Sequence, residues 1–152
     1  MSVRLGGPPR GTRGLSRRRI EAGAQALLAA LDCSDVELSV SLVDDATGAK
    51  LNRHWRGRPG ATDVLSFSLL AGAHARRRGA LLGDVVIALG VARRQARERG
   101  HTLEAECLRL LIHGVLHLLG YDHERARDAK RMQAKERTLW LELTAPRKRS
   151  AQ

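Results

Sequence analysis

The chain has 152 residues, 43% of them hydrophobic, which suits a single domain with one packed core. No run of about 18 apolar residues occurs, so we expect no membrane-spanning helix. The basic N-terminus lacks the apolar segment of a secretory signal, so we expect a cytoplasmic protein with no membrane attachment. Two cysteines, Cys33 and Cys107, are expected to be reduced and buried rather than bonded to each other.

The net charge of +11 is concentrated at the two ends of the chain. Residues 1–19 carry six arginines and no acidic residue, and residues 147–149 read Arg-Lys-Arg, which leaves +2 for the middle of the chain. Positive charge of this kind attracts polyanions such as nucleic acids. Because solubility alone also explains basic tails, the charge favours a nucleic-acid partner without deciding for it.

Apolar patterning predicts one domain over residues 16–144, between two basic tails. Residues 1–15, rich in Gly, Pro and Arg, are expected to be disordered, and residues 145–152 form the second tail. Sheet and helices in the predicted order indicate an α+β domain, in which a small mixed sheet packs against helices. The predicted elements are a helix over 16–31, a strand over 36–43, a short helix from Asp44 or Asp45 through Trp55, a loop over 56–62, strands over 63–70 and 83–89, and helices over 91–99, 102–119 and 124–143, with Ser16 and Thr102 as capping residues.

Three of the six histidines lie in HGVLHLLGYDH, residues 113–123. His113 and His117 are four apart, so they project from one face of a central helix that is otherwise apolar and buried. Gly120 suits the left-handed residue that ends a helix, and the turn after it allows His123 to approach the other two. Three imidazoles with a fourth position open to water are typical of catalytic zinc. We therefore expect one Zn²⁺ per chain, although copper, nickel and iron also accept these ligands.

The spacing is similar to that of the metzincin proteases, H-E-x-x-H-x-x-G-x-x-H, but Gly114 stands in the position of the glutamate. That glutamate is the general base of peptide hydrolysis, so the ligand pattern is kept while the peptidase base is missing. Glu124 is the nearest carboxylate that could replace this base, but its simpler role is as the first residue of the last predicted helix. Two alternatives stay open: a peptidase-like metal-dependent hydrolase with its base elsewhere, and a non-catalytic protein in which zinc holds the last two helices together.

The same segment closely resembles the H-G-x-L-H-L-x-G-Y-D-H signature of the bacterial YbeY family, the zinc-dependent endoribonucleases called rRNA maturation factors. LNRHWRGRPGATDVLSF (51–67) and LLGDVVIAL (81–89) are similar to two further family motifs, and together the three span most of the region 45–140 in the family's order. Ser68 departs from the proline that the family usually has there, and the arginine-rich N-terminal tail is longer than the family needs.

The resemblance implies a zincin-like α+β fold and a single-strand-specific endoribonuclease. It further implies roles in maturing small-subunit ribosomal RNA and in ribosome quality control, with ribosomal RNA and ribosomal particles or ribosome-associated proteins as partners. With this resemblance, the non-catalytic alternative is a ribosome-assembly factor in which zinc holds the last two helices together. It maps the zinc ligands onto His113, His117 and His123, and the family's functional arginine onto Arg56, the candidate catalytic residue. Arg56 is then expected to hold an RNA phosphate with its fork of donors, where the residues alone indicate a solvated loop arginine.

Overall fold

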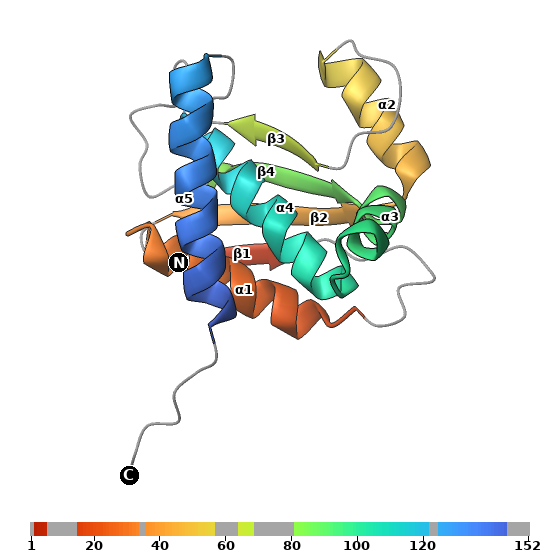
Figure 1. Cartoon of the computed structure of the whole chain (residues 1–152). Helices are drawn as coiled ribbons and strands as arrows, with labels where there is room; N and C mark the ends of the chain where they lie inside the picture. The colour runs from red at the N-terminus through yellow and green to blue at the C-terminus, as the bar shows by residue number, and fades with distance from the viewer. Residues whose placement is uncertain are drawn as a thin grey trace.

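The computed structural model describes residues 2–5, 15–33, 36–56, 64–68, 81–121 and 125–145, and within these ranges the side chains other than those of 2–5, 54–56, 65–68 and 81–82. None of the helices in these ranges combines the length and the apolar character needed to cross a bilayer. In chain order the elements are β1 (Ser2–Leu5), α1 (Arg17–Ala30), β2 (Glu37–Val43), α2 (Asp45–Arg56), β3 (Val64–Ser68), β4 (Leu81–Ala88), α3 (Leu89–Arg99), α4 (Leu103–Leu118) and α5 (Ala126–Thr144) (Figure 1).

The four strands form one mixed sheet in the order β1-β2-β4-β3. β1, β2 and β4 run parallel, whereas β3 is antiparallel to β4. Val40 lies opposite Val85, and Leu42 lies opposite Ile87. The expected α+β class with a small mixed sheet is therefore confirmed, and β4 lies inside the sheet between β2 and β3.

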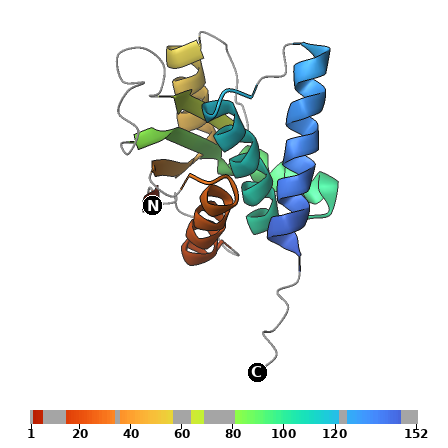
Figure 2. The same ribbon diagram turned by 90° about the vertical axis from the view of Figure 1, so that its left-hand side faces the viewer.

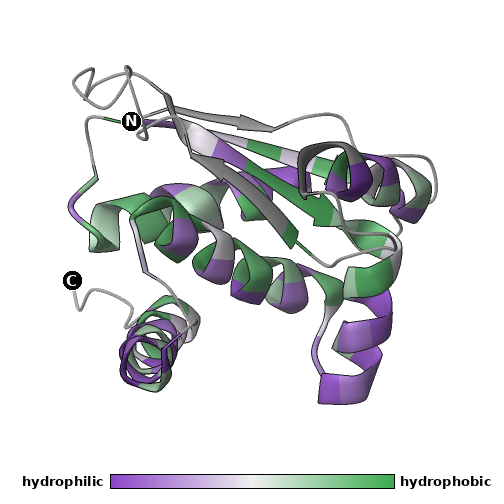
Figure 3. Ribbon diagram, turned by 90° about the horizontal axis from the view of Figure 1, so that it is seen from above, coloured by the Kyte–Doolittle hydropathy of each residue, from purple (hydrophilic) through white to green (hydrophobic). Residues whose placement is uncertain are grey.

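One face of the sheet is covered by α1 and α4, and α5 packs on the outer side of α4 (Figure 2). Burial alternates along β2, where Leu38, Val40 and Leu42 are buried and the residues between them are half-buried, as a period of two requires. Figure 3 shows the apolar sides of α1 and α4 facing the sheet. The largest fully buried side chains are Leu27, Leu28, Leu38, Leu42, Ile87, Leu110, Leu111, Ile112, Leu116 and Met132.

Side-chain caps begin the helices where the sequence predicts them. Ser16 accepts a hydrogen bond from the backbone N–H of Arg19, and Thr102 accepts one from the N–H of Ala105 at 3.1 Å. The Asp44 carboxylate accepts from the N–H of Thr47 at 2.7 Å, and this bond lowers the pKa of Asp44. The caps fix the starts of α1, α2 and α4, so these elements follow from local chemistry.

Four expectations need correction. Residues 2–5 were expected to be disordered, but they form β1, because the edge of β2 offers backbone partners that no local pattern announces. Leu89 begins α3 instead of ending the strand, and Arg56 ends α2 instead of opening a loop; residues 57–63 lie outside the described ranges. Cys107 is buried and both cysteines are free as predicted, but Cys33 is only half-buried.

Candidate metal centre

The second half of α4 is buried except at the two histidines. From Leu110 to Leu118, only His113 and His117 are partly exposed, and the other seven residues are buried. Together with Glu106 and Cys107, these make nine buried residues on α4, which fix the rotation of the helix against the sheet and α1. The two imidazoles are therefore held on the one side of the helix that solvent reaches.

His113 and His117 lie next to each other as their spacing predicts. Their ring centroids are 4.7 Å apart, with an interplanar angle of 75°. With zinc–nitrogen bonds of about 2.0–2.1 Å in a tetrahedral site, two imidazoles on one ion have centroids about 5 Å apart. The pair therefore fits a shared metal ion in both donor type and spacing.

A carboxylate from α5 contacts the first of these histidines. Nδ1 of His113 lies 3.1 Å from Oε1 of Glu136, and both side chains are partly buried. The sequence did not predict this contact. The feature of the sequence that could have indicated a partner for Glu136 is its place within an apolar stripe of α5. Met132 and Leu139 on the same stripe are both buried.

The turn after α4 has the predicted glycine. Gly120 has φ +97°, the left-handed region, and donates its N–H to the carbonyl of His117 at 3.0 Å. The N–H of Tyr121 bonds to the carbonyl of Leu116, also at 3.0 Å, which completes a Schellman motif. The chain thus reverses directly after the second histidine.

The third predicted ligand, His123, lies outside the described residues, so two of the three are brought together here. Within the ranges that the structure describes, no cluster of three or more His, Cys, Asp or Glu side chains has the arrangement of a metal site. The candidate centre is therefore a histidine pair at the end of α4, with the turn leading on from it.

Arg56 is the last residue of α2, and its side chain is not among those described. The start of α2 is tied to α3, since the Asp45 carboxylate accepts from the N–H of Val91 at 3.0 Å and pairs with Arg94 at 3.2 Å. Gly48 allows α2 to approach β4 closely, because a Cβ there would lie 3.2 Å from Cβ of Ala88. The backbone that carries Arg56 is thus anchored to the sheet and to α3.

Arg109, one turn before His113, is held by a buried carboxylate. Glu106 is fully buried, and its oxygens accept from Nε and Nη2 of Arg109 at 2.8 and 2.7 Å. Nη2 of Arg109 also donates to Gln95 of α3 at 3.3 Å. This pair was not predicted: the sequence indicated only that Arg109 interrupts an apolar helix.

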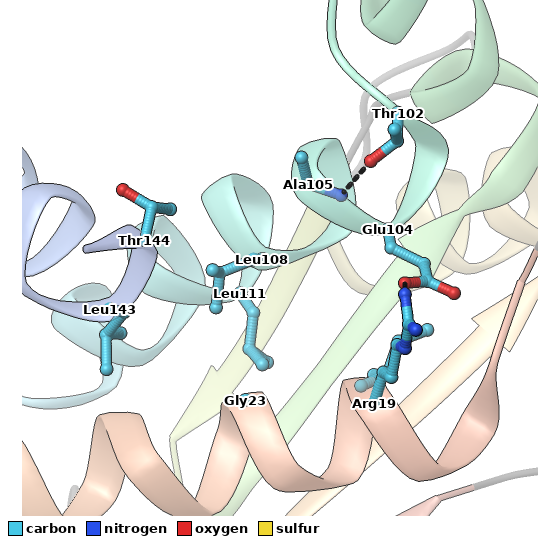
Figure 4. Close-up of a pocket in the computed structure, with 10 residues that line it drawn as sticks. Arg19, Gly23, Thr102, Glu104, Ala105, Leu108, Leu111, Leu143 and Thr144 are labelled. Carbon is cyan, nitrogen blue, oxygen red and sulfur yellow. Dashed lines mark hydrogen bonds and ion pairs between the residues drawn. The ribbon is translucent and has the colours of Figure 1, made fainter. Parts of the chain in front are cut away.

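His113 lines one cavity, of 340 Å³, together with Arg109, Ala129, Met132, Gln133 and Glu136. Another cavity, of 490 Å³, lies just beyond the C-terminal end of α4 and is lined by Leu119, Gly120, Tyr121, Asp128 and Arg131. A third cavity of 310 Å³ lies between α1, α4 and α5, where Arg19 pairs with Glu104 (Figure 4). Glu104 precedes His113 by nine residues, about 14 Å along the helix axis, so this third cavity belongs to the opposite end of α4.

Comparison with known proteins decides the family. The family model for endoribonuclease YbeY matches residues 12–144. The chain belongs to the YbeY endoribonuclease family. Two curated proteins named endoribonuclease YbeY are similar to it: one from Myxococcus xanthus is 55% identical over 80% of the chain, and one from Anaeromyxobacter sp. strain Fw109-5 is 51% identical over 91%.

The matched segment is shorter than the full length of these two YbeY relatives. It spans 42% of the Myxococcus protein's own length and 70% of the Anaeromyxobacter protein's. A solution structure from Thermotoga maritima is 28% identical, with a TM-score of 0.63, and the alignment covers 97% of this chain and 99% of that one. The α+β fold described above is therefore shared with a solved protein over nearly the whole chain.

Proposed function

We propose that this chain is a zinc-dependent endoribonuclease specific for single-stranded RNA, which acts in the maturation of small-subunit ribosomal RNA and in ribosome quality control. Membership of the YbeY family supports the reaction class, because the curated members it resembles are named endoribonucleases. The observation that carries the proposal is the pair of adjacent imidazoles, His113 and His117, on an otherwise buried helix.

We place one Zn²⁺ between His113, His117 and His123, in a zincin-like arrangement with the ligands on a central helix and the turn after it. The described part of this set supports the assignment, since the two imidazoles have the spacing of shared ligands and the Gly120 turn redirects the chain directly after them. Such an ion polarises a phosphoryl oxygen as a Lewis acid or lowers the pKa of its water to about 7.

We assign the other roles in the reaction to residues of the chain. Arg56, at the end of the anchored α2, is proposed to bind the scissile phosphate through its planar fork of donors, a role that lysine fills less well. Gly114 is buried on α4, in the position where a metzincin has its general base. A peptidase built on this site would lack its general base, because Gly114 stands in that position. A phosphodiester is therefore the better substrate for this site.

The outer side of α5 supports an RNA substrate. Arg127, Lys130, Arg131 and Arg137 are all exposed there, whereas Asp128 and Glu136 are half-buried. Arg131 also lines the cavity beside Gly120 and Tyr121. Positive charge next to the site attracts the RNA backbone and makes binding salt-dependent. Ribosomal RNA within ribosomal particles, in the cytoplasm, is the partner that we propose.

The proposal is tested by metal analysis paired with a nuclease assay on unstructured and duplex RNA. We expect one zinc per chain, and cleavage of the unstructured RNA that chelation abolishes and added zinc restores. Cleavage of casein without cleavage of single-stranded RNA would overturn the proposal in favour of a peptidase. Sedimentation with ribosomal particles, with no turnover of any substrate by the zinc-loaded chain, would overturn it in favour of an assembly factor.

A further inference from the structure

We infer that Glu136 is a positioning residue for His113: its carboxylate keeps the hydrogen on Nδ1, which leaves Nε2 of the same ring as the metal-binding nitrogen. The inference rests on the proposed function, because it assigns a role to Glu136 in the same zinc site. It concerns α5, a helix outside the three motifs that pointed to the family.

The chemistry of the contact sets the tautomer. An ionised carboxylate only accepts hydrogen bonds, so the 3.1 Å contact between Oε1 of Glu136 and Nδ1 of His113 requires a hydrogen on Nδ1. A neutral imidazole with hydrogen on Nδ1 has its lone pair on Nε2. Carboxylates that hold ligand histidines in this way fix the ring orientation and increase ligand basicity. His113 is thus held ready to bind a metal before the ion arrives.

Other contacts hold α5 in place independently of Glu136. Met132 and Leu139, one turn to either side of Glu136 on the same stripe, are each 1% exposed. Trp140 packs against His101, with ring centroids 5.3 Å apart. Because these apolar and aromatic contacts fix the helix, the Glu136 carboxylate is delivered to His113 from a rigid support, and its removal should leave α5 docked.

The surroundings of the contact indicate that the Glu136 carboxylate is directed at His113 and is not simply a solvent-exposed charge. Glu136, His113 and Arg109 line one cavity between α4 and α5. Arg109 is held there by the buried Glu106 and by Gln95, on the α3 side of its helix. The contact also joins residues that are 23 apart in sequence and on different helices, so it is not a by-product of helical spacing.

The test uses the full chain and three variants on α5. Glu136→Ala removes the acceptor, Glu136→Gln keeps an oxygen that can accept, and Glu142→Gln makes the same charge change at an exposed position of the same helix. Zinc affinity is measured by competition with a chromophoric chelator, and the His113 tautomer by ¹⁵N NMR of the zinc-free protein. Thermal unfolding of each zinc-free variant shows whether α5 stays docked, and Glu136→Gln replaces Glu136→Ala if the alanine variant does not fold.

We expect Glu136→Ala to weaken zinc binding about 10–100-fold, Glu136→Gln to weaken it less, and Glu142→Gln to leave it unchanged. The wild type should show hydrogen on Nδ1 of His113, and Glu136→Ala should lose that preference. Wild-type zinc affinity in Glu136→Ala, or weaker binding with an unchanged tautomer, would overturn the positioning role alone. Failure of the wild type itself to bind zinc would refute the proposed function instead.

Discussion

His113 and His117 lie edge to face on one side of α4, with ring centroids 4.7 Å apart. Every other residue between Leu110 and Leu118 is buried, so the core fixes the helix rotation that presents the two rings together. Packing of an apolar helix thus brings together two of the three histidines that we propose as zinc ligands. The third proposed ligand, His123, follows the turn at Gly120, where the chain leaves the helix.

Replacement of Gly120 by alanine should lower both stability and zinc affinity. A Cβ at φ +97° is strained by about 1–2 kcal/mol, although within the described ranges no atom beyond the two neighbouring residues lies within 4 Å of its position. Gly100→Ala is the matched control, since Gly100 has φ +69°, equally open space and a place at the end of α3. Denaturant unfolding without zinc should show a similar cost in both variants, and chelator competition a loss only in Gly120→Ala. Equal zinc affinity in the two variants would show that the Gly120 turn does not position a ligand.

Arg56→Ala should slow the cleavage of single-stranded RNA about 100-fold, since a fixed donor to a charged transition state is worth that much. Zinc content and melting temperature should stay at their wild-type values, because the anchoring contacts of α2 lie at its other end. Arg53→Ala removes an exposed arginine from the same helix and should leave the rate unchanged. Zinc loss in Arg56→Ala would mean that the residue supports the fold.

Glu106→Ala should destabilise the fold by about 3–5 kcal/mol, because it leaves the half-buried guanidinium of Arg109 without its main partner. Glu98→Ala removes an exposed carboxylate from α3 and should change the free energy of unfolding by less than about 0.5 kcal/mol. Urea denaturation measures both. A cost for Glu106→Ala near that of the control would show that the pair contributes little.

Cys107 should resist alkylation at pH 8, where the half-buried Cys33 reacts. Burial, with a smaller contribution from Glu106, raises the pKa of Cys107 from 9.0 to about 12. Above pH 9 the unfolded chain releases this proton and the folded chain keeps it, so the free energy of unfolding should fall as the pH rises from 9 towards 12. Mass spectrometry after iodoacetamide treatment counts the modified thiols. Two modified cysteines in the folded protein would contradict the burial of Cys107.

Local chemistry explains what the sequence could predict. Alternation along Glu37–Val43 and the caps Ser16 and Thr102 each act within a few residues, and the structure has these elements at nearly the predicted bounds. Gly120 is a further example of local chemistry, since the left-handed backbone conformation of this one residue ends α4. The α+β class follows from the order of such elements.

Contacts between distant segments explain what it could not predict. β1 has four residues, and its pairing with β2 is chosen by the exposed edge of that strand. Glu136 and Glu106 were visible as acids on helices, but their partners depend on how α3, α4 and α5 pack. Periodicity gives the face on which a side chain lies and leaves its neighbour on the next helix undetermined.

The zinc content of single histidine variants tests the central claim most directly. We measure zinc per chain by elemental analysis for the wild type, His113→Ala, His117→Ala, His123→Ala and the control His101→Ala, a histidine that packs against Trp140. We predict one zinc in the wild type and the control, and little or none in the three motif variants, with loss of RNA cleavage in the same three. Full zinc and full activity in His117→Ala would contradict the account.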